Sequence, residues 1–274
     1  MVIKTLVENT AIADKFESVH GLSLYIETKK HKLLFDLGPN ELFAKNAPKL
    51  NADISKVDIV VISHGHYDYG GGLREFLNIN SKAKIYVQQA AFKKHYSNRP
   101  NGEKSSIGLD EGLLPNERVV FVDNHLVIDE ELELFSNVEA ESLTPSDNQD
   151  LLMASGELLV PDDFRHEQNL IIKENGNLLM VAGCAHNGIV NILQHFYALK
   201  KDFPTHVIGG FHLYSYSKNK CEDLAKIKQI GEYLKTTDAK FYTCHCTGIE
   251  PYEKLKEIIN EKIKYLATGR QFII

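Results

Sequence analysis

Four apolar segments of this chain are each followed, within a few residues, by a histidine. The segments cover residues 57–62, 178–182, 206–211 and 240–243, and the histidines are His64, His186, His212 and His245. Their apolar and β-branched content predicts buried strands. Because side chains just past the carboxyl ends of such strands meet at one edge of a helix-covered sheet, the sequence predicts a cluster of histidines at that edge.

The order of the predicted elements indicates an α/β architecture. Further strands are expected at 2–8, 22–27, 32–36, 84–88, 169–173 and 271–274, and helices at 41–49, 73–78, 188–200, 221–235 and 250–264. We interpret residues 1–274 as one domain, a length that a single core allows. Two long irregular segments, at about 93–117 and 141–165, are expected near the site, because long loops in compact domains are usually functional or disordered.

The composition and net charge limit the kinds of binding partner that we expect. The formal net charge is -6, so no broad cationic field is expected and a general nucleic-acid binder is disfavoured. We expect no membrane span, because the chain contains no apolar run of about 18 residues. The N-terminus reads as a strand, and four cysteines fit reduced thiols, so we expect a cytoplasmic protein. A small-molecule substrate is the expected partner, and a homodimer is one assembly that the sequence allows.

The run from Ser63 to Asp68 (Ser-His-Gly-His-Tyr-Asp) has the composition of a metal site. His64 and His66 are two apart, so in an extended segment both imidazoles can point the same way. Asp68 adds an oxygen donor, and this mixture suits zinc, iron or manganese. A His-Gly-His run can also be a polar loop, but the buried strand before it and the glycines at 70–72 favour the metal site.

The same run resembles the first metal motif, HxHxDH, of the metallo-β-lactamase superfamily. Further segments carry the resemblance over nearly the whole chain: 20–24 (HGLSL), 35–38 (FDLG), 183–191 (GCAHNGIVN), 209–213 (GGFHL) and 245–248 (HCTG). Within the superfamily, the chain resembles a subgroup related to the archaeal dihydropterin ribofuranosylaminobenzene phosphate synthase. The resemblance implies an αββα sandwich, with two mixed sheets flanked by helices and the metals at one sheet edge.

Position 69 departs from the motif. Members of the superfamily usually have a histidine there, a ligand of the second metal, and this chain has Tyr69. A neutral phenol is a poor ligand, so the occupancy of a second metal position is in doubt. Tyr69 could instead donate a hydrogen bond to the substrate or a bound water, or simply pack.

The remaining ligand predictions come from strand ends. We predict His186 as the third ligand and His245 as the next. His212 could be a ligand, a catalytic residue or a substrate contact. His166 precedes the hairpin strand where many superfamily members place a metal histidine, although a surface polar residue is the default interpretation.

Sulfur and carboxylate side chains could support these ligands. Cys184 follows the strand where the superfamily places a bridging carboxylate, and it is either a thiolate ligand or a buried inert thiol. Cys244 and Cys246 flank His245, so in an extended segment they would point away from it and be structural. Asp36 either accepts a hydrogen bond from a ligand imidazole, and so fixes its tautomer, or is an ordinary carboxylate at a strand end.

The leading functional hypothesis is a metal-dependent hydrolase or transferase acting on a small, phosphorylated or otherwise anionic substrate. A metal-bound hydroxide would attack, with Asp68 orienting it or handling the proton. The expected cofactor is Zn2+, as one or two ions, with iron or manganese as alternatives. Arg99 and Lys104 could clamp phosphate, unless their segment is merely a solvated charged loop. One alternative hypothesis is iron-dependent oxygen or sulfur chemistry at the same site. Another is a protein that binds metal but has no catalytic activity, because Tyr69 replaces a metal ligand.

Overall fold

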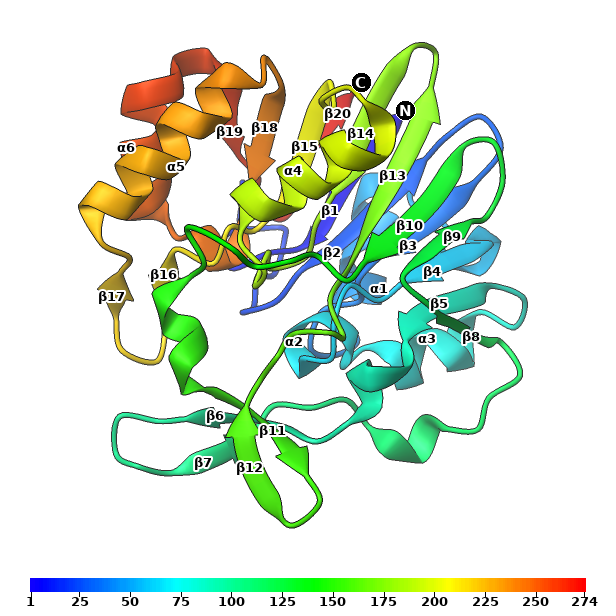
Figure 1. Cartoon of the computed structure of the whole chain (residues 1–274). Coiled ribbons are helices and arrows are strands. Elements are labelled where there is room, and N and C mark those ends of the chain that lie inside the picture. The colour runs from blue at the N-terminus through cyan, green and yellow to red at the C-terminus, as the bar shows by residue number, and fades with distance from the viewer.

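The computed structural model describes residues 1–274 and contains two seven-stranded mixed sheets (Figure 1). The first has the order β20-β1-β2-β3-β4-β5-β8. Its strands are β1 (Val2–Val7), β2 (Ser23–Glu27), β3 (Lys32–Phe35), β4 (Ile59–Val61), β5 (Lys84–Gln88), β8 (Val119–Val122) and β20 (Gln271–Ile273). Pairing is antiparallel from β20 to β3 and parallel from β3 to β8. β4 is buried at every position, as expected of a parallel strand covered on both faces.

The second sheet has the order β19-β18-β15-β14-β13-β10-β9. Its strands are β9 (His125–Val127), β10 (Leu132–Ser136), β13 (Gln168–Glu174), β14 (Asn177–Val181), β15 (His206–Gly209), β18 (Lys240–Thr243) and β19 (Ile263–Tyr265). β14, β15, β18 and β19 run parallel, so the ends of β14, β15 and β18 open on the same edge. This placement brings the strand-end segments together, as the sequence predicted.

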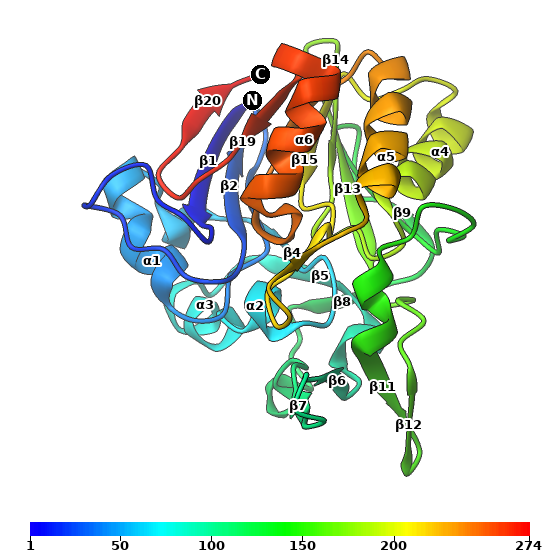
Figure 2. The same cartoon turned by 90° about the vertical axis from the view of Figure 1, so that its left-hand side faces the viewer.

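Helices cover the outer face of each sheet, and Figure 2 shows the layers from the side. α1 (Leu42–Asn46) and α3 (Leu73–Ile79) pack on the first sheet. α4 (Ile189–Lys200), α5 (Leu224–Thr236) and α6 (Ile249–Ile259) pack on the second. A third apolar cluster fills the space between the sheets, with Phe35 and Leu170 among its fully buried side chains. The predicted αββα sandwich is therefore confirmed.

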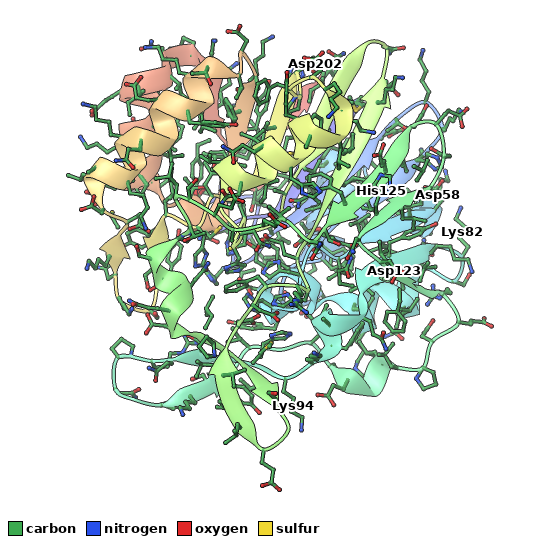
Figure 3. All side chains as sticks on the ribbon, in the orientation of Figure 1. Asp58, Lys82, Lys94, Asp123, His125 and Asp202 are labelled. Atoms are coloured by element: carbon green, nitrogen blue, oxygen red, sulfur yellow. The ribbon has the colours of Figure 1, made fainter.

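The polar exterior surrounds these layers (Figure 3). Lys82, Lys94 and Asp202 are examples of charged side chains that lie exposed at its periphery. None of the helices combines the length and apolar character that crossing a membrane requires.

The two segments predicted to be irregular contain short strands. β6 (His95–Asn98) and β7 (Lys104–Ser106) come from the first segment, and β11 (Leu151–Ser155) and β12 (Leu158–Pro161) from the second. Together they form a separate four-stranded sheet, which projects at the foot of Figure 1. The sequence did not reveal these strands because each is short and at least half of each lacks full burial, so its apolar pattern is weak.

Three predicted helices begin or end differently. The helix expected over 250–264 ends at Ile259, and Ile263–Tyr265 form strand β19. The helix expected over 41–49 ends at Asn46 and continues as a separate 3-10 turn from Pro48, because proline cannot donate the backbone hydrogen bond that would extend it. α5 begins at Leu224 rather than at 221. Residues Lys220–Cys221 form β17, which pairs with β16 (Tyr214–Ser215), and the Asp223 side chain caps the helix.

Candidate metal centre

Three histidine rings form a triangle, and two of them, His66 and His186, line a pocket. His64 and His66 follow β4, and His66 caps the short helix α2 (Tyr67–Gly70), while His186 follows β14. Their ring centroids are 4.6 Å apart for His64–His66, 5.1 Å for His64–His186 and 5.0 Å for His66–His186. All three side chains are buried.

The orientation of His64 is set by its neighbour. The Nδ1 of His64 lies 2.8 Å from the Ser63 hydroxyl, and the Ser63 backbone N–H donates to Asp36 at 2.7 Å. Asp36 was expected to accept from the imidazole itself, but it reaches the ring only through Ser63. Gly183 makes room for this arrangement, because a Cβ there would lie 2.1 Å from the Ser63 hydroxyl oxygen.

His186 is held from three sides. Its Nδ1 lies 3.0 Å from the Asn148 amide oxygen, and its backbone N–H donates to Glu167 at 2.6 Å. Its ring stacks on Phe164 with a centroid distance of 4.5 Å and an interplanar angle of 5°. These contacts lock the ring with Nε2 as its free nitrogen.

The free nitrogens fit a metal ion. The Nε2 atoms of His64, His66 and His186 are buried without any hydrogen-bond partner, which is costly for polar atoms unless something binds them. Burial, with repulsion from His166, lowers the pKa of His66 to about 3, and burial holds the pKa values of His64 and His186 well below the usual value. The rings therefore stay neutral, as metal ligation requires.

A second group stands beside the triangle. The Nε2 of His245 lies 3.1 Å from Oδ2 of Asp68, and the Nε2 of His20 lies 3.5 Å from the same oxygen. Asn9 holds the opposite nitrogen of His245 at 2.6 Å. Burial raises the pKa of Asp68, but the hydrogen bond from His245 outweighs it and lowers the value to about 2. Asp68 is therefore an anion at neutral pH, suited to a metal or to a positively charged histidine.

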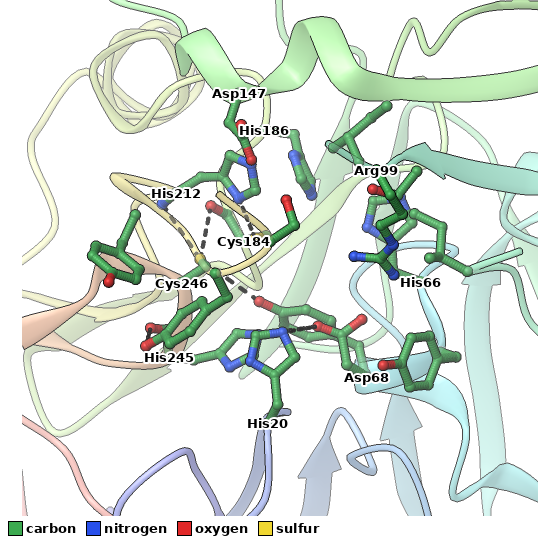
Figure 4. A pocket seen from close by; sticks show the side chains of 18 residues that line it. His20, His66, Asp68, Arg99, Asp147, Cys184, His186, His212, His245 and Cys246 are labelled. Atoms are coloured by element: carbon green, nitrogen blue, oxygen red, sulfur yellow. Dashed lines mark hydrogen bonds and ion pairs between the residues drawn. The ribbon is translucent and has the colours of Figure 1, made fainter. Parts of the chain in front are cut away.

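Sulfur atoms form a third group. Cys184, His212 and Cys246 place one potential ligand atom each within 4.8 Å of one another. The sulfur of Cys184 lies 3.0 Å from Nδ1 of His212, whose Nε2 is buried without a partner. Cys246 was expected to be structural, yet its side chain lines the pocket (Figure 4). The reason is that residues 245–247 form a 3-10 turn rather than an extended segment.

Burial raises the pKa of the Cys246 thiol, but hydrogen bonds from Cys184 and His212 outweigh it and hold the pKa well below the usual thiol value. The pKa of Cys184 is raised, first by burial and then by Cys246. Cys246 is therefore the more acidic thiol of the pair.

Tyr69 is buried against this group. Its ring centroid lies 4.2 Å from that of His64, and its hydroxyl donates to the Cys246 sulfur at 3.7 Å. Burial raises the pKa of its hydroxyl well above the usual value. Tyr69 is thus a neutral hydrogen-bond donor in this structure.

His166 lies behind His66 and has both ring nitrogens engaged. Its Nδ1 accepts the Gly65 backbone N–H at 2.9 Å, and its Nε2 lies 3.2 Å from Asp162, which also contacts His95 at 2.8 Å. These residues and His66 are close enough to form a further ligand group. With its nitrogens occupied in this way, His166 supports the backbone of the His64–His66 loop.

The pocket has a volume of about 290 Å³ and is lined by 18 residues, a size near the lower end of small-ligand pockets. Arg99 and the rings of Tyr67, Tyr214 and Tyr216 form part of its wall. The pKa of His20 is lowered to about 4, mainly by burial, with His245 and Arg99 adding repulsion. Lys104 is exposed on β7 and does not line the pocket.

The backbone is strained at this edge. Asp36, Ala185, His212 and His245 all have φ between 48° and 60°, in the left-handed region that non-glycine residues seldom adopt. Such residues cluster at functional sites, where the surrounding structure holds them in place. The strain turns His212 and His245 sharply out of their strands toward the pocket.

Comparisons with known proteins agree with this geometry. Residues 18–147 match the family model for the metallo-beta-lactamase superfamily. An uncharacterized protein of Methanocaldococcus jannaschii is 30% identical over 94% of this chain and 95% of its own length. This chain belongs to the metallo-beta-lactamase superfamily.

Two more proteins resemble the chain along almost its whole length. The 7,8-dihydropterin-6-methyl-4-(beta-D-ribofuranosyl)-aminobenzene-5'-phosphate synthase of M. jannaschii is 26% identical over 98% of this chain and 95% of its own. A solved structure described as a metal-dependent hydrolase of the beta-lactamase superfamily is 28% identical, with a TM-score of 0.85 over 100% of this chain and 99% of that one.

Within this superfamily site, the structure adds residues that the sequence analysis did not single out. Ser63, Asn148 and Asn9 each hold a histidine, and His20 joins Asp68. No short-range spacing signals Asn9, which lies 236 residues from His245. His20 belongs to segment 20–24, which carried the family resemblance, and this was the one sequence feature that could have indicated its place at the site.

Proposed function

We propose that this chain is a metal-dependent hydrolase that acts on a small anionic substrate in the pocket above His64, His66 and His186. The observation that carries the proposal is the three buried Nε2 atoms without partners, which converge from two strand ends. Zinc is the proposed ion, since three histidines with an open position form a common catalytic zinc site. A bound ion of this kind supplies Lewis acidity and lowers the pKa of a coordinated water.

Other pocket residues would transfer protons and bind the substrate. Asp68 and His245 lie 3.1 Å apart at the pocket, with His245 buried, and can hold and pass a proton between carboxylate and imidazole. His20 can hydrogen-bond the same carboxylate from the more exposed side. Arg99 provides a positive charge for phosphate or carboxylate groups of the substrate.

A transferase is the second candidate, because one relative is a synthase. The same residues would then direct an acceptor other than water to the scissile group. Product analysis separates the two: hydrolysis incorporates oxygen from labelled water into the product, and transfer does not.

The test is hydrolysis of a panel of phosphodiesters, phosphomonoesters and carboxylic esters by zinc-loaded protein. We expect turnover that is lost on chelation and falls by at least about a hundredfold in His66→Ala. His125→Ala is the matched control, because His125 lies on β9 and does not line the pocket. Turnover that survives both chelation and His66→Ala would contradict the proposal.

A further inference from the structure

The two sulfurs in the pocket are not used by the proposed reaction. Cys184 follows β14, Cys246 follows β18, and His212 follows β15, which lies between those two strands in the sheet. Their potential ligand atoms lie within 4.8 Å of one another. Three donor side chains from three neighbouring parallel strands therefore converge on one point of the pocket wall (Figure 4).

The Cys246 sulfur accepts two hydrogen bonds, and as a thiol it donates one to the Cys184 backbone carbonyl at 3.5 Å, a proton that a bound cation would replace. The His212 backbone N–H points to it at 3.3 Å, and the Tyr69 hydroxyl donates to it at 3.7 Å. Both donors favour negative charge on this sulfur, and the side chain is buried. A buried thiolate with a neighbouring thiol and imidazole is a typical environment for a thiophilic cation.

The backbone makes room for this sulfur. A Cβ at Gly210 would lie 2.3 Å from the Cys246 sulfur, closer than any side chain can approach. The glycine before Phe211 therefore lets the Cys246 side chain turn into the pocket beside His212. A cysteine that only filled space would need neither the room left by Gly210 nor the two hydrogen-bond donors directed at its sulfur.

Cys184 connects the sulfur group to the histidine triangle. Its sulfur lies within 4.8 Å of ligand atoms of His64 and His186, as well as of His212 and Cys246. It therefore stands between two groups of donors. A thiolate in this position can contact an ion on either side.

We propose that Cys184, His212 and Cys246 bind a second, thiophilic divalent ion next to the ion of the histidine triangle, with Cys184 between the two. Zinc, cobalt(II) or cadmium fits this donor set better than magnesium or manganese, because thiolates are soft ligands. Two cysteines and one histidine leave a fourth coordination position open for water or substrate. The proposal rests on the proposed function only in placing the first ion in the triangle.

The proposal also accounts for Tyr69. At the position where the superfamily motif usually has a histidine ligand, this chain has a phenol whose hydroxyl contacts the Cys246 sulfur. In this arrangement, Cys246 supplies the ligand that position 69 does not. The second ion is thereby bound by sulfur rather than by the imidazole of the usual motif.

The experiment is metal binding to the reduced, metal-free protein. Cobalt(II) titration is followed by near-ultraviolet sulfur-to-cobalt charge-transfer absorption, and zinc-loaded protein is measured by elemental analysis and X-ray absorption. We expect about two ions per chain and a zinc–sulfur shell at about 2.3 Å. In Cys246→Ser, we expect about one ion per chain and loss of most of the sulfur signal.

Cys221→Ser is the matched control, because Cys221 lies on β17 and does not line this pocket; it should retain both ions and the full signal. If Cys246→Ser does not fold, His212→Asn is expected to show the same loss of one ion. A wild type with no sulfur in the first shell, or a Cys184–Cys246 disulfide that persists under reductant, would overturn the proposal.

The outcomes separate this proposal from the proposed function. One histidine-bound ion per chain without sulfur ligation overturns the sulfur site and leaves the hydrolase proposal standing. A sulfur signal in a protein whose turnover survives His66→Ala supports the sulfur site and contradicts the hydrolase proposal. Protein that binds no ion at all contradicts both.

Discussion

The Ser63 hydroxyl lies 2.8 Å from Nδ1 of His64, so that Nε2 is the ring nitrogen left without a partner. This contact fixes which nitrogen of His64 can meet an ion. Outer partners of this kind typically contribute a factor of ten to a hundred in metal affinity.

We therefore expect Ser63→Ala to weaken zinc binding about tenfold to a hundredfold. Competition with a chromophoric chelator would measure the change. Ser81→Ala, an exposed serine outside the pocket, should leave the affinity unchanged. Equal affinities in the wild type and Ser63→Ala would show that the contact does not orient the ring.

Tyr69→Phe should separate packing from hydrogen bonding at position 69. The ring would still pack on His64, but the donor to the Cys246 sulfur would be lost. We expect the affinity for a sulfur-bound cobalt ion to fall about two- to tenfold, the usual effect of one hydrogen bond. The histidine-bound ion should be unaffected, and Tyr197→Phe on α4, outside this pocket, is the control.

Metal binding should persist into mild acid. Protons compete for imidazole nitrogens, and an ordinary histidine is half protonated at about pH 6.5. The pKa of His66 is lowered to about 3, mainly by burial, and the pKa values of His64 and His186 are also well below the usual value. We expect zinc retained in equilibrium dialysis to fall by half only below about pH 5.5; half-loss at the ordinary histidine pKa would contradict these shifts.

His31 should make stability depend on pH away from the pocket. Its ring nitrogens lie 2.8 Å from Asp58 and 2.6 Å from Asp129, next to β4 and β10 of the two sheets. Burial lowers its pKa, but the hydrogen bonds to these aspartates outweigh it and raise the pKa above the usual value. The stabilisation is therefore complete below the unfolded pKa of about 6.5 and is lost as the pH rises through the higher folded pKa.

The measurement is the free energy of unfolding of the wild type and His31→Gln at several pH values. We expect a deficit in His31→Gln of about 1 kcal/mol or less near pH 5.5, because the pair is partly screened by solvent. The deficit should shrink as the pH approaches about 9. A deficit that grows with pH would mean that the sign of the shift is wrong.

Arg99 and Lys104 were both candidates for binding phosphate, but we expect their replacement to have different effects. Arg99 lines the pocket, and Lys104 is exposed outside it. With an anionic substrate from the hydrolysis panel, we expect Arg99→Ala to raise KM about tenfold or more with little change in kcat. Lys104→Ala should behave as the wild type, and an equal effect of both variants would indicate general attraction of anions rather than a contact.

The sequence predicted the sandwich and the edge at which the site forms. The sandwich was implied by the resemblance to the superfamily. The edge follows from local patterns: apolar strands, the helices after β14, β15 and β18, and histidines just past strand ends. Parallel order then brings these ends together. The helix ends were less predictable, because they depend on capping by Asp223 and on the pairing of β16 with β17.

The sequence by itself determined which side chains could be metal ligands at this edge and where they lie along the chain, from His64 and His66 to His245. Only the tertiary structure decided which nitrogen of each ring is free, since Ser63, Asn148 and Asn9 select it through contacts that strand patterns do not encode. It also decided that Cys246 faces the pocket. That direction follows from the left-handed backbone of His245 and the space above Gly210, which alternation along a strand cannot predict.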